Sequence, residues 1–490
     1  MRGTVMSLRP ILGLVASAFL VMGLTASHSN FLVRIKAASP EQVAAMLTEK
    51  GFDVAGQNHK ASTLEVVTAV PEDLEALADG SATMPDQAFA VLSVEPTQPY
   101  QRVVAASAAA HDATTVDAYP NTDQTYQKLR DMAAANPTVA QVVNLNEWLN
   151  LPLSAEGRPL MALRVGTDPS FKTNKIKTLY IGEHHARELM THQAVLDIAD
   201  NLLKELASGT PIYTDWIKDT DVWFVPVVNP DGLAHVFAGD RWWRKNRANN
   251  ADGSRGVDLN RNYPFKWGTC GATSTQGASD TFRGASAGSE PESKTMDRLN
   301  SELHFQFAIS FHSSGDEVLY PYLCGQMAEA PIYYSIMESL RTELGYGKRL
   351  ASSSGEDFEN HYARYGTIAF LLEVGDEFQP EFATYRNHVW PSVAKTLPFM
   401  LKEVHKPYLT INVQDGTSRA PLKGAKVALD KIVFKEGEVR ETDGYGTYRW
   451  RVLPETYQLT VTAAGYRNET RTVTVRTNVA ETVTVEMSAN

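Results

Sequence analysis

Residues 178–202, TLYIGEHHARELMTHQAVLDIADNL, decide the fold. They begin with the short extended run Thr178–Ile181, and the polar residues 182–188 follow it. Apolar residues then recur at helical spacing, at Leu189, Ala194, Ile198 and Leu202. An extended run, a polar loop and an amphipathic helix together form the unit from which helix-covered sheets are built.

Three further runs have the same apolar character: Val222–Val228, Phe305–Phe311 and Ile368–Val374. They are apolar nearly throughout, as central strands covered on both faces are. Because they alternate with helical patterns, we expect an α/β domain over residues 116–406, with a mixed, largely parallel sheet covered by helices on both faces.

Both flanks have a different pattern. Residues 30–97 alternate extended and helical stretches, with expected helices at Pro40–Lys50 and Pro71–Ala78, which predicts a small α/β sandwich. The Ala-rich stretch Val103–Thr115 is typical of a linker, so residues 28–115 form one N-terminal region. Residues 407–490 alternate apolar and polar side chains with period two, which predicts a β-sandwich of about seven strands.

The N-terminus reads as an export signal over residues 1–27. Arg2 and Arg9 precede the apolar run Ile11–Leu24, which is too short to span a membrane as a helix. A membrane anchor made of the same segment is the alternative. Either interpretation places the body of the chain outside the cytosol, as a secreted, periplasmic or extracellular protein. No stable membrane insertion is expected once a signal is removed.

The net charge limits the kind of binding partner, and the cysteine count limits the number of disulfides. Lys and Arg number 46 and Asp and Glu 57, a formal net charge of −11, which disfavours nucleic acid as a partner. The two cysteines, Cys270 and Cys324, most simply form one disulfide in an exported chain.

A first candidate site lies in the loop 182–188. His185 and Glu188 are three residues apart, and one helical turn would place both on the same face, where they could share a cation. Taken alone the pair is a weak signal, because H-x-x-E also occurs in solvated first turns of helices.

Polar clusters also follow the other apolar runs, where sites lie in open α/β sheets. They are Asn229–Gly232, Arg241–Arg247, Gly256–Asn262, Phe311–Gly315 and Ala369–Gly375. Glu373 stands out because an ionised carboxylate in an apolar run costs several kcal/mol to bury unless it is compensated. A nearby dication would compensate it, and an ion-paired core glutamate is the alternative.

The order and text of the loop 182–188 and of these later segments resemble the zinc metallocarboxypeptidases of the carboxypeptidase A, B and T kind, over roughly residues 118–405. Glu156–Leu160 resembles a structural segment of the same family. The resemblance implies one Zn²⁺ per chain, held by His185, Glu188 and His312, with a fourth position open for water. It implies hydrolysis of the C-terminal peptide bond of peptides and proteins.

The resemblance also assigns roles to six further residues. Glu373 would be the general base towards the zinc-activated water, and Arg244 would stabilise the oxyanion. Asn260 and Arg261 would grip the substrate's terminal carboxylate, with Arg187 lining the subsite nearby. Asp258 would orient the His185 ring.

Two departures from the family pattern concern substrate binding. The family's mobile tyrosine has no counterpart between Gly347 and His361, because counting back from Glu373 reaches Ala351, and Tyr346 lies too early. In addition, Ser314 stands where an aromatic residue is common. The same count places the specificity floor at Phe358 or Glu359. Phe358 would favour apolar C-terminal residues and Glu359 would favour Lys or Arg.

The N-terminal and C-terminal flanks also resemble domains that accompany such enzymes. Residues 28–115 resemble the propeptide of such enzymes, with a non-inhibitory accessory domain as the alternative. Residues 407–490 resemble transthyretin-like or carboxypeptidase-regulatory-like domains, which suggests folding support or partner contact. Two rival functions stay open: a zinc amidase acting on cell-wall or modified peptides, and a non-catalytic, zinc-stabilised binding protein.

Overall fold

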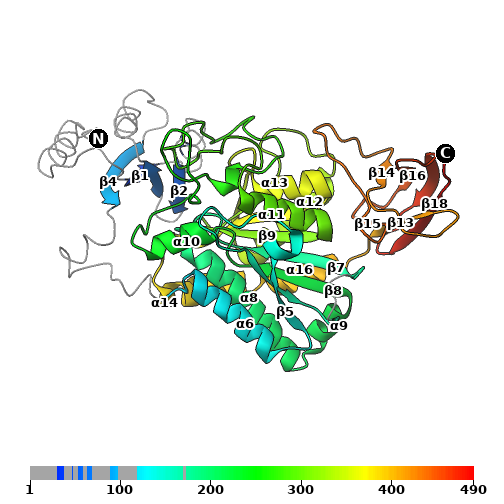
Figure 1. Ribbon diagram of the computed structural model, residues 1–490, viewed down its shortest axis with the longest axis horizontal. Helices are drawn as coiled ribbons and strands as arrows, with labels where there is room; N and C mark the ends of the chain where they lie inside the picture. The colour runs from blue at the N-terminus through cyan, green and yellow to red at the C-terminus, as the bar shows by residue number, and fades with distance from the viewer. Residues whose placement is uncertain are drawn as a thin grey trace, which may run out of the picture.

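The fold was analysed in a computed structural model of the chain (Figure 1). The structure describes residues 118–168 and 173–490. Towards the N-terminus it describes four strands, at 30–37, 53–58, 63–68 and 89–97, and the single positions Val43 and Leu47.

A sheet of eight strands forms the centre of the molecule, in the order β11-β10-β12-β9-β7-β8-β6-β5. The strands β12, β9, β7 and β8 run parallel, whereas β10 pairs antiparallel with β12 and β6 pairs antiparallel with β8 and β5. Their bounds are β5 (Ala140–Asn144), β6 (Met161–Val165), β7 (Ile176–Ile181), β8 (Thr220–Val225), β9 (Phe307–His312), β10 (Glu317–Tyr320), β11 (Gly347–Leu350) and β12 (Ile368–Glu373). The predicted mixed sheet with a parallel centre is confirmed.

Alternate residues of each central strand pack into two different cores. Tyr180, Phe224 and Ile309 belong to one buried cluster. Their neighbours Leu179, Trp223 and Ala308 belong to the other. Because successive side chains point to opposite faces of a strand, the sheet lies between two apolar layers. This explains why the central runs are apolar nearly throughout.

Helices cover both faces. The first cluster takes side chains from α6 (Thr122–Ala135), α8 (Leu189–Ala207), α9 (Pro211–Asp219), α10 (Pro230–Phe237), α12 (Ala330–Leu344), α15 (Trp390–Val393) and α16 (Thr396–Val404). The second takes them from α7 (Leu145–Leu149) and α11 (Pro291–Leu303), and α13 (Asp357–Tyr365) contributes to both. The shorter elements are η1 (Leu259–Arg261), α14 (Phe382–Thr384) and the π-helix η2 (Tyr385–Val389).

The N-terminal strands form a separate antiparallel sheet in the order β2-β3-β1-β4, at the opposite end of the molecule from the C-terminal strands (Figure 1). The strands are β1 (Asn30–Ala37), β2 (Asp53–Asn58), β3 (Thr63–Thr68) and β4 (Phe89–Thr97). The sequence analysis did not predict β2. The two helices expected in this region lie outside the described residues, apart from Val43 and Leu47, as do the export signal and the linker.

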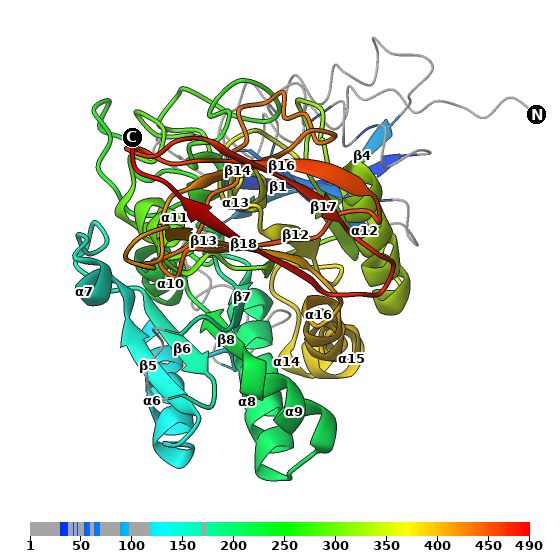
Figure 2. The ribbon, with the colours of Figure 1, turned by 90° about the vertical axis from the view of Figure 1, so that its right-hand side faces the viewer.

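The C-terminal module, residues 407–490, contains two three-stranded sheets around its own core (Figure 2). One sheet has the order β15-β13-β18 and the other β14-β16-β17. The strands are β13 (Leu409–Asp415), β14 (Lys426–Leu429), β15 (Thr447–Trp450), β16 (Thr456–Thr462), β17 (Glu469–Thr474) and β18 (Glu481–Met487). Six strands form where about seven were expected.

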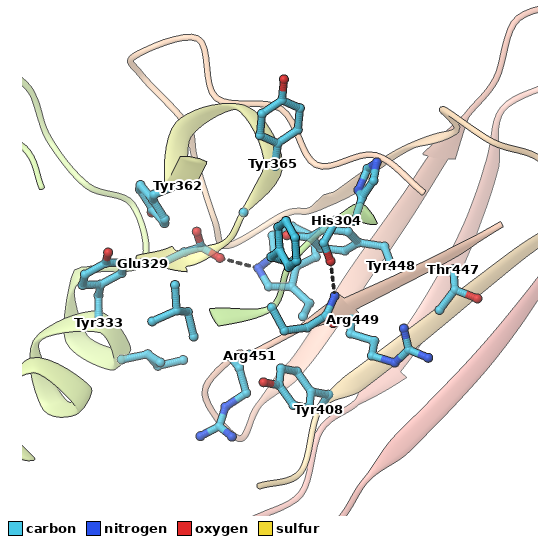
Figure 3. A pocket seen from close by; sticks show the side chains of 16 residues that line it. His304, Glu329, Tyr333, Tyr362, Tyr365, Tyr408, Thr447, Tyr448, Arg449 and Arg451 are labelled. Atoms are coloured by element: carbon cyan, nitrogen blue, oxygen red, sulfur yellow. Dashed lines mark hydrogen bonds between the residues drawn. The ribbon is translucent and has the colours of Figure 1, made fainter. Parts of the chain in front are cut away.

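The module packs directly against the helices next to the central sheet. Figure 3 shows Glu329 and Tyr362 facing Tyr408 and Tyr448 across the junction. The buried Arg440 donates to Glu329 Oε2 at 2.6 Å and to the carbonyl of Tyr362 at 3.1 Å, near the C-terminal end of α13. The space left in this junction is about 30 Å³, so the two parts are closely packed.

Cys270 and Cys324 form the expected disulfide, which joins two loops 54 residues apart in sequence. Within the described residues, no helix is long and apolar enough to cross a lipid bilayer.

Candidate metal centre

The carboxyl ends of the parallel strands bring the predicted site residues to one edge of the sheet. His185 and Glu188 lie in the loop between β7 and α8, and Glu188 directly precedes the helix. His312 ends β9 and Glu373 ends the neighbouring β12. Parallel strands end at the same edge, and sites in open α/β sheets form there.

His185, Glu188 and His312 converge, and all three are buried. Each can offer one ligand atom such that these atoms lie within 4.8 Å of one another. His185 Nδ1 lies 2.7 Å from Glu188 Oε1, and His312 Nδ1 lies 3.2 Å from Glu188 Oε2. The two Nδ1 atoms are 3.1 Å apart. The turn that aligns the first two residues is closed by the Glu188 amide, which donates to the His185 carbonyl at 3.1 Å.

The donor set fits a cation. His185 Nε2 faces the carboxylate of Asp258 at 3.2 Å, which favours the hydrogen on Nε2 and a lone pair on Nδ1. That lone pair faces a carboxylate oxygen and a second imidazole nitrogen, an arrangement that repels unless a proton or a metal cation lies between them. Two imidazole nitrogens and a carboxylate are a ligand set typical of catalytic zinc.

Asp258 holds three site residues at once. Its Oδ1 accepts a hydrogen bond from the backbone amide of Asn260 at 2.9 Å and also faces the His185 ring. Its Oδ2 accepts from Arg244, with Nε at 3.1 Å and Nη2 at 2.8 Å. Burial alone would raise the pKa of Asp258, but the charges of Arg244, His185 and Arg261 hold it well below its usual range. Asp258 therefore stays ionised, and the sequence analysis did not foresee its link to Arg244.

Glu373 lies beside this cluster. It pairs in register with His312 of β9, and its side chain is 15% exposed. Burial, reinforced by the carboxylate of Glu188, raises the pKa of Glu373 to about 8, against the opposing charges of Arg349 and His185. A carboxyl group with a pKa near neutral can exchange protons efficiently at the working pH.

The other expected arginines differ in their surroundings. Arg244 Nη1 lies 3.9 Å from Glu188 Oε1, at the edge of the metal cluster. Arg261 donates from Nε to the Ala272 carbonyl at 2.7 Å and from Nη1 to Glu356 Oε1 at 3.0 Å. Arg187 instead contacts Asp280 at 3.4 Å and lies over the Phe378 ring.

Asn260 is tied to the start of α13, because its Oδ1 accepts the Asp357 amide at 2.9 Å. Phe358 of this helix is 1% exposed and packs in the second core. Glu359 accepts the Leu323 amide at 2.9 Å. The acidic residue that contacts Arg261 is Glu356, one residue before the helix. Glu356 was not among the residues predicted from the sequence, although it lies only two residues before Phe358.

The structure also shows where the two positions considered for the family's mobile tyrosine lie. Ala351 is buried in the second core, and the Tyr346 hydroxyl is bonded to Ser392 at 2.8 Å on the other side of the sheet. Tyr346 therefore lies in the protein interior.

Comparison with known families gives two matches along the chain. Residues 125–397 match the family described as zinc carboxypeptidase. Residues 409–488 match the carboxypeptidase regulatory-like domain. The first match covers the central sheet and every residue of the candidate site.

Among curated proteins, the chain is 32% identical over 232 residues to the inactive metallocarboxypeptidase ecm14 of Sclerotinia sclerotiorum, covering 45% of this chain and 38% of that protein. It is 35% identical over 182 residues to metallocarboxypeptidase A of Trichophyton tonsurans, covering 36% of this chain and 42% of that protein. The matches thus span about two fifths of the length of these relatives.

Among solved structures, carboxypeptidase A of Helicoverpa armigera has a TM-score of 0.59 at 24% identity and covers 76% of this chain and 96% of its own. That likeness concerns the fold.

Proposed function

Since the chain belongs to the zinc carboxypeptidase family, we propose that it is an active metallocarboxypeptidase that removes single residues from the C-terminal ends of peptides and proteins. The observation that carries the proposal is the convergence of His185 Nδ1, His312 Nδ1 and the Glu188 carboxylate at the sheet edge where Glu373 ends its strand. Zinc held there would supply Lewis acidity to the scissile carbonyl and favour ionisation of the attacking water.

The chain's own residues divide the remaining work. Glu373 takes a proton from the attacking water and returns it to the leaving amine, so that hydrolysis ends with a free carboxylate and a free amine. Arg244 stabilises the negative charge that develops on the carbonyl oxygen, because Asp258 already holds its guanidinium in place. Asp258 also fixes the orientation of the His185 ring.

We assign recognition of the substrate's C-terminal carboxylate to Asn260 and Arg261, with Arg187 lining the subsite nearby. A planar guanidinium binds a carboxylate through two parallel hydrogen bonds. Arg261 is 5% exposed, and the Ala272 carbonyl and Glu356 hold its guanidinium in place. This grip distinguishes a carboxypeptidase from the rival amidase, whose substrates need not end in a free carboxylate.

Location and regulation are also proposals. The disulfide between Cys270 and Cys324 favours an oxidising compartment, in agreement with the expected export signal. The four-stranded sheet of residues 30–97 is compatible with an inhibitory propeptide, and the C-terminal module with folding support or partner contact. The domain boundaries 28–115, 116–406 and 407–490 stay predictions.

Peptides that differ only in the last residue test the proposed function. We expect mass spectrometry to detect release of single C-terminal residues, loss of this activity after treatment with a zinc chelator, and recovery when zinc is restored. Fragments cut at internal bonds, or activity indifferent to the chelator, would contradict the proposal. The same panel compares apolar with Lys and Arg ends, and so measures the residue preference that Phe358 and Glu359 left open.

A further inference from the structure

Two carboxylates face each other across the strands beside the metal centre. The strands β10 and β12 are antiparallel, and their register places Glu317 directly opposite Glu373. Like charges at directly opposite positions of an antiparallel pair repel each other. Glu317 is 3% exposed, so water screens this repulsion little. An ionised Glu373 therefore needs a cation on this side.

Arg349, from the adjoining edge strand β11, supplies that cation. Its Nε lies 2.8 Å from Glu317 Oε2, and its Nη2 lies 3.5 Å from Glu373 Oε1. Its Nη1 donates to the Ser352 hydroxyl at 2.7 Å, which fixes the third nitrogen of the guanidinium. The planar group thus uses separate nitrogens for the two carboxylates, which a single ammonium group could not do in the same geometry.

Zinc held by the neighbouring cluster would compensate the charge of Glu188, so the repulsion that Arg349 offsets comes from Glu317. The direction of the Glu373 side chain is therefore set by a balance between repulsion from Glu317 and attraction to Arg349.

We propose that Arg349 is a positioning residue for Glu373: its guanidinium bridges Glu373 to Glu317 and fixes the direction in which the Glu373 carboxylate faces the reacting centre. The inference rests on the proposed function, in which Glu373 carries the proton. Arg349 acts through Glu373, so its loss should lower kcat and leave KM nearly unchanged. A misplacement of about 1 Å can cost on the order of 100-fold in rate.

The wild type, Arg349→Met, Glu317→Gln and the double variant form a mutant cycle that tests the proposal. Arg349→Met should lower kcat about 10- to 100-fold, with KM within about twofold. The double variant should recover much of this loss, because removal of the opposing charge makes the cation unnecessary. Arg349→Lys should lie between the wild type and Arg349→Met. Lys348→Met is the matched control, because Lys348 lies on the same strand but pairs with Glu338, and it should retain wild-type kcat.

Crystal structures of the wild type, Arg349→Met and the double variant give a second readout that does not depend on activity. The Glu373 carboxylate should turn away from its wild-type direction in Arg349→Met and return in the double variant. Zinc content should change little in all of them.

An unchanged Glu373 direction, an unchanged kcat, or a raised KM with retained kcat would each overturn the positioning role. The last result would make Arg349 a substrate contact. A wild type that releases no C-terminal residues would instead reject the proposed function, and the Glu373 direction would still decide the role of Arg349.

Discussion

Replacing Glu373 with glutamine should lower kcat on peptides by about 10²- to 10⁴-fold and leave the zinc content unchanged. Glutamine has nearly the same size and can keep the contact with Arg349, but it cannot accept a proton from water. Glu373 has no place among the three converging ligands, so the metal should stay bound. Steady-state kinetics and elemental analysis of the same preparation measure both quantities.

The matched control is Glu292→Gln. Glu292 is a fully buried glutamate of α11, and burial raises its pKa to about 8, but it bonds to Asn246 and is not one of the three converging ligands. The same chemical change there should keep kcat close to the wild type. Turnover of Glu373→Gln near the wild-type value would remove Glu373 from the mechanism.

Amidation of a peptide's C-terminus should depress kcat/KM about 10²- to 10⁴-fold. Two charge-assisted hydrogen bonds from Arg261 and its neighbours contribute about 1.5–3 kcal/mol each, and about 1.4 kcal/mol corresponds to a factor of ten. Changing the substrate is sharper than changing Arg261, because removal of Arg261 would leave Glu356 buried without its cation.

An N-terminally acetylated peptide of the same sequence serves as the control. It also loses a charge, but at the end that Arg261 does not bind, and it should be cleaved like the unmodified peptide. Equal cleavage of amidated and free peptides would favour the rival amidase function.

The central strands and the place of the polar candidates could be predicted from the sequence for one physical reason, whereas the role of each candidate came from the family resemblance. A parallel strand covered on both faces is apolar nearly throughout, so a polar residue at its end stands out, as His312 and Glu373 do. The loop 182–188 follows β7 in the same way. Strands that run parallel end at one edge, and the local patterns therefore indicated a shared site.

The surroundings of Glu373 could not be predicted in this way. The strands β10 and β11 have four residues each, EVLY and GKRL, and their patterns are too short to identify. Contact between Glu317, Arg349 and Glu373 depends on the order β11-β10-β12, which is not the order in the chain. The strand β2, DVAGQN, was missed because it contains a glycine and few apolar residues.

The direction of side chains at the start of α13 could not be predicted from the sequence either. Counting along the chain indicated Phe358 and Glu359 as the specificity floor, but the start of α13 turns Phe358 into the second core and Glu359 towards the Leu323 amide. Glu356 contacts Arg261 instead. A helix start changes the face of each successive residue by about 100°, so an error of one residue in its position changes which side chain meets the site.

The central claim, that His185, Glu188 and His312 hold one zinc ion, is tested most directly by anomalous diffraction at the zinc absorption edge from crystals of the zinc-loaded protein. We predict one peak per chain, within bonding distance of Nδ1 of both histidines and of the Glu188 carboxylate. No peak between these three side chains, or a zinc ion bound elsewhere in the chain, would contradict it.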